Sequence, residues 1–348
     1  LLAIAAAVFV ARRDDVAAPP KKDAPRLAGP GILVAGADPP QMMQTQAEPI
    51  DVVVDGDGTV WVAETEASQV ERIGSGADPE IYEMPGNPTA LAAGEEGLWV
   101  VMPFQDKVAL LDPDNGDVRA IDVPSGTDSV TSGGGRGWLG NGIDSTLTPI
   151  DPDTLELGRP IRTGARPRSN LQRQAIHTAV EFADGGVWMI SNYFYGHLTR
   201  VDAGTLKVQR VPVRIAEDGF GHPPNRANMQ IHLAASDDQI WIGFDRWVNF
   251  ATEPLQLIEL PDLTHHTIGT VPSPQTEVRK GVLDLALEGG DLWIVTPDGL
   301  VRAEPVLSCV GEEIRRRCSM PIEDEIGIAA ARRVFALDGR VWVTVGSG

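Results

Sequence analysis

The side chains best suited to chemistry in this chain are histidines and carboxylates that recur at matching places in an internal repeat. The chain has 348 residues, and seven of its eight tryptophans recur at a mean spacing of about 47 residues. When the repeats are aligned on this tryptophan, one polar or small residue precedes the first strand of each repeat. The series is Asp51, Ala90, Asp128, His177 with Thr178, His232, Asp284 and Arg332.

This series allows two interpretations. Carboxylates and imidazoles that converge on one point can share a divalent ion, and an oxygen-rich set favours calcium or magnesium. The candidate metal ligands are Asp51, Asp128, His177, His232 and Asp284. Alternatively, these side chains line a polar, water-filled channel and hydrogen-bond to adjacent repeats.

Aromatic and arginine side chains form a second candidate site in the two longest repeats. The spacing between successive tryptophans rises from about 38 residues early in the chain to about 50 and 53 in these repeats. The candidate ligand-binding residues are Tyr193, Phe194, Tyr195, Phe220, Arg226, Arg246, Trp247 and Phe250. Aromatics combined with arginine are typical of recognition surfaces. The alternative is that these rings pack long loops onto the scaffold.

Other catalytic signatures are missing from the sequence. No nucleophile elbow, phosphate-binding loop or His-Glu-x-x-His motif occurs. His265 and His266 fall on an expected outer strand, where we expect exposure to solvent. The formal net charge of −20 argues against nucleic acid as a partner, because phosphate contacts need a basic surface.

The repeat itself predicts the fold. Segments such as GTVWVAE at 58–64 and GGVWMIS at 185–191 are each followed by an alternating strand and a turn, as in VALLDPDNGDV. Short alternating strands bounded by Asp, Gly and Pro are typical of antiparallel blades. The seven tryptophans are Trp61, Trp99, Trp138, Trp188, Trp241, Trp293 and Trp342. We therefore expect an all-β protein, a seven-bladed β-propeller of four-stranded antiparallel blades with these indoles buried between the sheets.

The last repeat stops after two strands, at VWVTVGSG. Residues 31–48 precede the first complete repeat and are expected to supply one or both missing strands. Such a mixed blade would join the two ends of the chain and remove exposed sheet edges.

The N-terminal residues have a different character. Residues 1–11 are apolar and indicate a truncated signal or transmembrane segment, and residues 12–30 form a Pro/Ala-rich linker. The propeller is expected over 31–348. Cys309 and Cys318, the only cysteines, are predicted to form a disulfide in an oxidising compartment. Two unpaired thiols are the alternative.

The G-x-[VL]-W-[VI] strands and D-x-x-[TN]-[GL] turns over about 49–348 resemble bacterial propellers of the streptogramin-lyase-like, NHL and YVTN groups. That resemblance implies a lyase, a lactonase or the extracytoplasmic sensor part of a transmembrane Ser/Thr kinase. We expect a membrane-tethered or exported module that binds a protein or small ligand over repeats four and five. The alternative is a lyase or lactonase with a divalent metal at the channel mouth.

Overall fold

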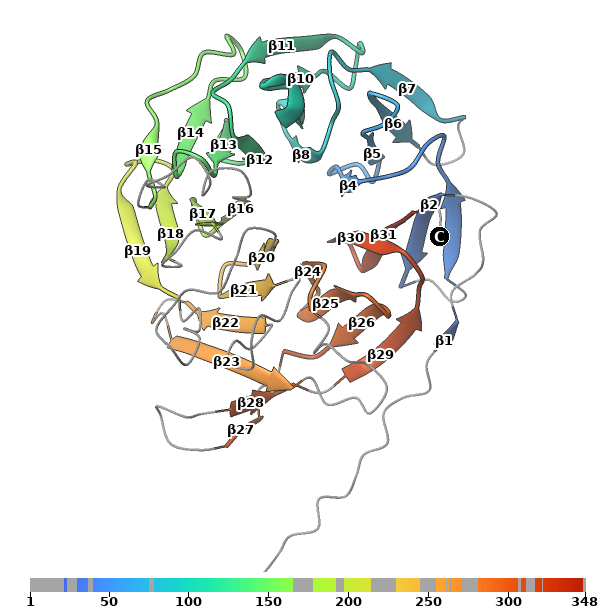
Figure 1. Ribbon diagram of the computed structural model, residues 1–348, viewed down its shortest axis with the longest axis vertical. Coiled ribbons are helices and arrows are strands. Elements are labelled where there is room, and N and C mark those ends of the chain that lie inside the picture. The colour runs from blue at the N-terminus through green and yellow to red at the C-terminus, as the bar shows by residue number, and fades with distance from the viewer. Residues whose placement is uncertain are drawn as a thin grey trace, which may run out of the picture.

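The computed structural model describes residues 22–23, 30–36, 40–74, 78–164, 178–191, 197–213, 230–244, 255–260, 262, 264–270, 281–305, 308–310, 317–320 and 322–346. Seven sheets stand around a central axis, and the four strands of each blade run antiparallel from an innermost strand at the axis to an outermost strand (Figure 1). The predicted seven-bladed β-propeller is therefore confirmed.

Blades one to three each follow the chain from the inside outward. Blade one comprises β4 (Asp51–Val54), β5 (Val60–Glu64), β6 (Gln69–Ile73) and β7 (Glu80–Glu83). Blade two comprises β8 (Ala90–Gly94), β9 (Gly97–Met102), β10 (Lys107–Leu111) and β11 (Val118–Asp122). Blade three comprises β12 (Thr127–Ser132), β13 (Gly137–Asn141), β14 (Thr146–Ile150) and β15 (Ile161–Arg162).

Blades four to six repeat this order. Blade four comprises β16 (Thr178–Ala183), β17 (Gly186–Ser191), β18 (His197–Asp202) and β19 (Val208–Pro212). Blade five comprises β20 (Ile231–Ala235), β21 (Gln239–Phe244), β22 (Leu255–Glu259) and β23 (Thr264–Thr270). Blade six comprises β24 (Asp284–Glu288), β25 (Asp291–Thr296), β26 (Gly299–Ala303) and β29 (Ile322–Gly327).

Blade seven closes the ring with strands from both ends of the chain. Its inner strands are β30 (Ala331–Leu337) and β31 (Arg340–Val345), and its outer strands are β2 (Gly31–Ala35) and β3 (Gln41–Gln44). Strand β2 pairs antiparallel with β31, with Val34 opposite Trp342. The expectation that residues 31–48 complete the last blade is confirmed, and they supply both missing strands.

The repeated tryptophans fill the wedges between blades. All seven lie on the second strand of a blade, and even the most exposed, Trp293, shows only 8% of its surface. Several indoles also satisfy their N–H groups locally, as when Trp61 Nε1 donates to Asp55 Oδ2 at 2.8 Å. Because each large flat ring covers apolar surface on two sheets, this position specifies blade packing rather than ligand binding.

Arginines on the third strand cover several of these rings. Arg72, Arg200 and Arg302 stand opposite Trp61, Trp188 and Trp293 in register. Their guanidinium carbons lie 5.3 to 5.8 Å from the ring centroids. Cation–π contacts of this kind shield the solvent-facing edge of each wedge.

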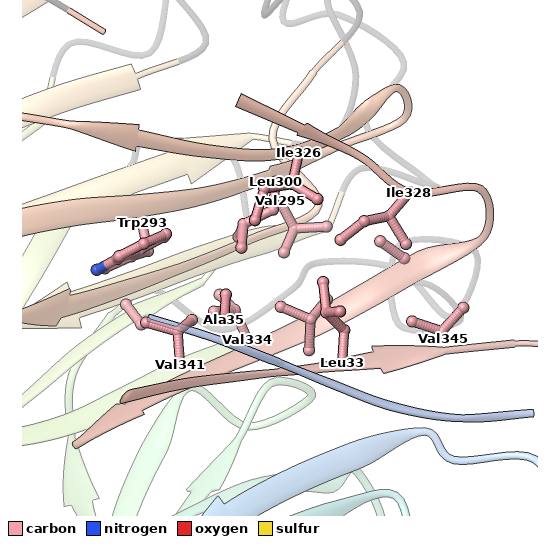
Figure 2. Packing of buried hydrophobic residues seen from close by; sticks show 13 residues of the cluster. Leu33, Ala35, Trp293, Val295, Leu300, Ile326, Ile328, Val334, Val341 and Val345 are labelled. Atoms are coloured by element: carbon pink, nitrogen blue, oxygen red, sulfur yellow. The ribbon is translucent and has the colours of Figure 1, made fainter. Parts of the chain in front are cut away.

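The wedge between blades six and seven shows how closure is stabilised. Leu33 of β2 packs with Val341 and Val343 of β31 and with Val295 and Leu300 of blade six (Figure 2). Leu33 is fully buried. The N-terminal strand therefore belongs to the core and is not a surface addition.

Two additions extend the blades outward. The hairpin β27 (Ser308–Val310) and β28 (Arg317–Ser319) interrupts blade six between its third and fourth strands, yet β28 pairs parallel with β23 of blade five. Strand β1 (Lys22–Asp23), in the expected linker, pairs parallel with β29. No helix among the described residues has the length and apolar character needed to cross a membrane. The apolar segment 1–11 lies outside them.

Candidate functional site at the channel mouth

The inner strands of all seven blades enclose a central channel with a cavity of about 360 Å³. Its lining includes most of the series identified by aligning the repeats. These mouth residues are Asp51, Ala90, Asp128, Thr178, His232, Asp284 and Arg333. We call the face of the propeller on which they lie the mouth face. His177 lies outside the described residues.

The structure corrects the series by one residue in blade seven. Arg333 lines the channel, whereas Arg332 forms an ion pair with Glu48 of the segment that leads into blade one. The register of β30 against β31 shifts between Ala331 and Val334. Such a bulge turns the following side chain to the other face of the strand, which aligned repeats cannot reveal.

Three of the aspartates connect neighbouring blades. Asp51 of blade one accepts the Leu91 N–H of blade two at 2.8 Å, and Asp128 of blade three accepts the Thr178 N–H of blade four at 3.0 Å. Asp284 of blade six accepts the Val334 N–H of blade seven at 2.9 Å. Each carboxylate thus satisfies a backbone donor of the next inner strand.

These contacts bear on the predicted metal site. Each aspartate is already bonded to a backbone N–H of the next blade. Among the described residues, no three His, Cys, Asp or Glu side chains gather closely enough to hold a metal ion. These contacts fit the polar-channel interpretation of Asp51, Asp128 and Asp284, and the metal site stays a prediction, since His177 lies outside the described residues.

A compact cluster occupies the side of the mouth formed by blades five to seven. His232 Nδ1 lies 3.2 Å from Asp284 Oδ1, and Arg333 Nη1 lies 3.5 Å from the same oxygen and 3.4 Å from His232 Nδ1. Burial would raise the pKa of Asp284, but Arg333 and His232 outweigh it and hold that pKa below its usual range. Asp284 therefore stays ionised and orients both neighbours.

The histidine of this cluster is almost completely enclosed. His232 is 2% exposed, and its Nε2 has no hydrogen-bond partner among the described residues. With Nδ1 held by Asp284, Nε2 is the ring nitrogen left to act as an acceptor or base. This arrangement resembles the way a carboxylate orients a catalytic imidazole, although here the free nitrogen is buried.

For the other channel carboxyls burial outweighs the neighbours that favour ionisation, which include Arg333 for Asp51 and Thr178 for Asp128. Burial raises the pKa of Asp51 to about 6 and that of Asp128 to about 7. Glu181 lies on β16, deeper in the channel. Burial, followed by repulsion from Asp284 and Asp51, raises its pKa to about 8. A fraction of these carboxyl groups therefore stays protonated near neutral pH.

Glu181 was not identified from the sequence. It lies in the middle of an inner strand, three residues beyond Thr178, and the alignment considered only residues at strand starts. In the segment TAVEFA the glutamate is the one charged residue and has an apolar residue on each side. A lone carboxyl in such a strand is the feature that could have indicated it.

The candidate recognition residues all lie outside the described residues. The strands that flank their segments are described, and the register fixes which face these strands reach. Thr178 pairs with Ser191, His197 with Pro212, and Ile231 with Phe244. Each of these strand ends therefore lies at the mouth face.

One described aromatic side chain is prominent on that same face. Phe104 lies in the short 3₁₀ turn Pro103–Gln105 between β9 and β10 of blade two, and it is 74% exposed. Strand β9 ends at the mouth because Ala90 pairs with Val101. An isolated phenylalanine in a turn carries little sequence signal, so this residue was also missed.

The two neighbouring histidines of blade five are on its outer strand, β23, as expected. The expected exposure is wrong for His266, which is 9% exposed, with Nε2 2.9 Å from Glu259 Oε2. The added strand β28 pairs with the same outer strand at Ile268 and Thr270. The side chain of His265 is outside the described set.

Comparison with known proteins places the fold. No family model matches the sequence, and no curated protein matches it. Virginiamycin B lyase from Staphylococcus aureus superposes with a TM-score of 0.56 and 14% identity, over 87% of this chain and 96% of that one. BamB from Moraxella catarrhalis gives 0.53 and 13%, over 93% and 94%.

This chain has the streptogramin-lyase-like propeller fold. A more distant structure, U3-55K, superposes similarly with a TM-score of 0.57 at 7% identity, over 90% of this chain and 98% of that one. Since such different proteins share the scaffold, the likeness establishes architecture and leaves function to the site.

Proposed function

We propose that this protein is a non-enzymatic binding module that captures a protein or small ligand on its mouth face, next to blades four and five. One observation carries the proposal. The described strands that flank the long aromatic and arginine-rich segments all reach the face that holds the channel mouth and Phe104. Long segments on a rigid scaffold usually carry function.

The composition of these segments supports recognition. Tyrosine and tryptophan offer large contact areas at low entropic cost, and arginine forms forked hydrogen bonds to carboxylate or phosphate. The segment at 162–177 contains four arginines and no acidic residue, in a chain of net charge −20. An anionic group on the ligand fits this local charge.

The place of action belongs to the proposal as well. An apolar segment, a Pro/Ala-rich linker and a single cysteine pair favour an extracytoplasmic, membrane-anchored or secreted protein. A sensor part of a transmembrane kinase fits the same order of segments.

The experiment uses defined probes. A synthetic array of acidic peptides and anionic glycans would be screened with the wild-type protein, and the best probe would be titrated by calorimetry. Tyr195→Ala, Trp247→Ala and Phe104→Ala are each expected to weaken binding at least about tenfold at unchanged melting temperature. Leu206→Ala, exposed on the turn between β18 and β19 away from the mouth face, is the matched control.

The opposite pattern would contradict recognition. If the loop variants melt early while their folded fraction binds normally, the aromatic side chains pack loops. If no probe binds the wild-type protein, anionic recognition is wrong.

A second candidate is a lyase or lactonase-type enzyme. The contact between His232 and Asp284 at the channel mouth favours it, and a catalytically inactive histidine-to-alanine variant of virginiamycin B lyase was solved with quinupristin. Incubation with quinupristin, with and without magnesium or calcium, would reveal turnover as a change in chromatographic retention. Wild-type turnover that is lost in His232→Ala would favour the enzyme over the binding module.

A further inference from the structure

Two carboxyl groups are completely buried at the rim of blade one, away from the channel cluster. Glu64 ends β5 and Glu71 lies on β6, and both have 0% exposure. The register places Glu64 opposite Gln69 and Val62 opposite Glu71. Because residues two apart on a strand share a face, both carboxyls point into the wedge shared with blade seven.

Both carboxyls are bonded to the segment that closes the ring. The Ala47 N–H donates to Glu64 Oε1 at 2.7 Å, and the Gln46 N–H donates to Glu71 Oε2 at 3.0 Å. Gln69 also donates from its side chain to Glu64 Oε2. Residues 45–50 connect β3 of blade seven to β4 of blade one, and they end directly before Asp51 at the channel mouth.

The remaining oxygen indicates a shared proton. Glu71 Oε1 is buried and accepts no hydrogen bond, while Glu64 lies on the same face of the neighbouring strand, diagonally across from Glu71. Two carboxylates cannot donate to each other, so a proton between them satisfies both.

We propose that Glu64 and Glu71 form a proton-dependent latch, which holds residues 45–50 against blade one and so steadies the channel mouth. When the shared proton is lost, the two buried charges repel and the segment is released more often. This latch depends on ring closure alone and stands whatever ligand the mouth face binds.

The direction of the pH effect follows from linkage. Burial, followed by the Glu64 carboxyl, raises the pKa of Glu71 from 4.5 to about 7, although the Gln46 N–H acts in the opposite direction. The latched state therefore binds the proton more tightly than the open state. Stabilisation of the latch is complete below about pH 4.5 and falls as the pH rises through about 7.

The charges around the pair do not replace this proton. Glu83 on β7 stands opposite Gln69 but is exposed, and its charge would add to the repulsion. Arg332 of blade seven pairs with Glu48. Arg72, the next residue on β6, turns to the other face and covers Trp61.

The test measures the closing segment directly. Hydrogen exchange of the Gln46 and Ala47 amides, corrected for the intrinsic pH dependence of exchange, would be followed from pH 5 to pH 8. We expect protection to fall by roughly tenfold or more in the wild type, since one pKa unit corresponds to a factor of ten. Glu71→Gln keeps the shape and should give pH-independent protection, whereas Glu83→Gln, the matched control, should behave as the wild type.

Two results would overturn the latch. One is a wild-type protection that does not change with pH after correction, and the other is an equal slope in Glu71→Gln. If Glu71→Gln does not fold, carbon-13 carboxyl NMR of the wild type decides, because the latch requires the Glu71 carboxyl to titrate above pH 6.

Discussion

At the scale of single residues, the channel aspartates combine two tasks that the sequence could not separate. A polar residue before each inner strand was visible from the aligned repeats, but its partner was not. Asp284 contacts the backbone of the next blade, Arg333 and His232 at once. Such a residue is expected to matter for stability before any ligand is considered.

We predict that Asp284→Ala lowers the free energy of unfolding by about 2–4 kcal/mol, because it leaves the Val334 N–H and Arg333 without their carboxylate. Urea denaturation at pH 7 measures the loss. Asp122→Ala removes a side chain that is 85% exposed and pairs with Lys107, so it should cost about 0.5 kcal/mol or less. Equal losses in the two variants would show that the cluster is not structural.

Glu181 predicts a pH dependence of stability. Its pKa is raised from 4.5 to about 8, so its ionisation opposes folding. Its favourable protonated form is fully present below about pH 4.5 and is lost as the pH rises through about 8. Glu181→Gln should therefore raise the melting temperature at pH 9 relative to the wild type and leave it unchanged at pH 4. Scanning calorimetry at both pH values checks this, and a shift of equal size at both would contradict it.

At the scale of elements, the blades were predictable because the tryptophan strand and its turns repeat. The hairpin β27–β28 was not, since it interrupts blade six and adds to blade five. A repeat pattern cannot predict a strand that pairs with a different repeat from its own.

The hairpin strengthens one sequence-based prediction without testing it. Cys309 and Cys318 are direct partners in the antiparallel register, a placement that suits a cross-strand bond. We predict that the protein secreted into an oxidising compartment shows no free thiol by thiol titration in denaturant, and that reduction exposes two per chain. Two free thiols before reduction would leave the cysteines unpaired.

At the scale of the whole molecule, closure determines cooperativity. Blade seven is complete because its second and third strands come from opposite ends of the chain, so that β31 is paired on both sides. The sequence indicated this closure, because the last repeat lacked two strands and residues 31–48 were available. The site was less predictable. The bulge that turns Arg333 into the channel and the position of Glu181 within an inner strand both depend on packing between blades.

Closure leads to a prediction about the chain before blade one. Among the described residues, a variant that lacks residues 1–30 loses only Pro30 and β1, which lies outside the ring, and we expect its urea midpoint to stay close to that of the full chain. A variant that lacks residues 1–44 also loses β2 and β3, and with them the buried side chains of Ile32 and Leu33. Burying two such side chains stabilises a protein by roughly 3–6 kcal/mol, and their removal also exposes the edge of β31.

Exposed edges pair with other chains, so the shorter variant should unfold at lower urea concentration and form oligomers in size-exclusion chromatography. If it remains monomeric with the midpoint of the full chain, blade seven does not hold the ring together.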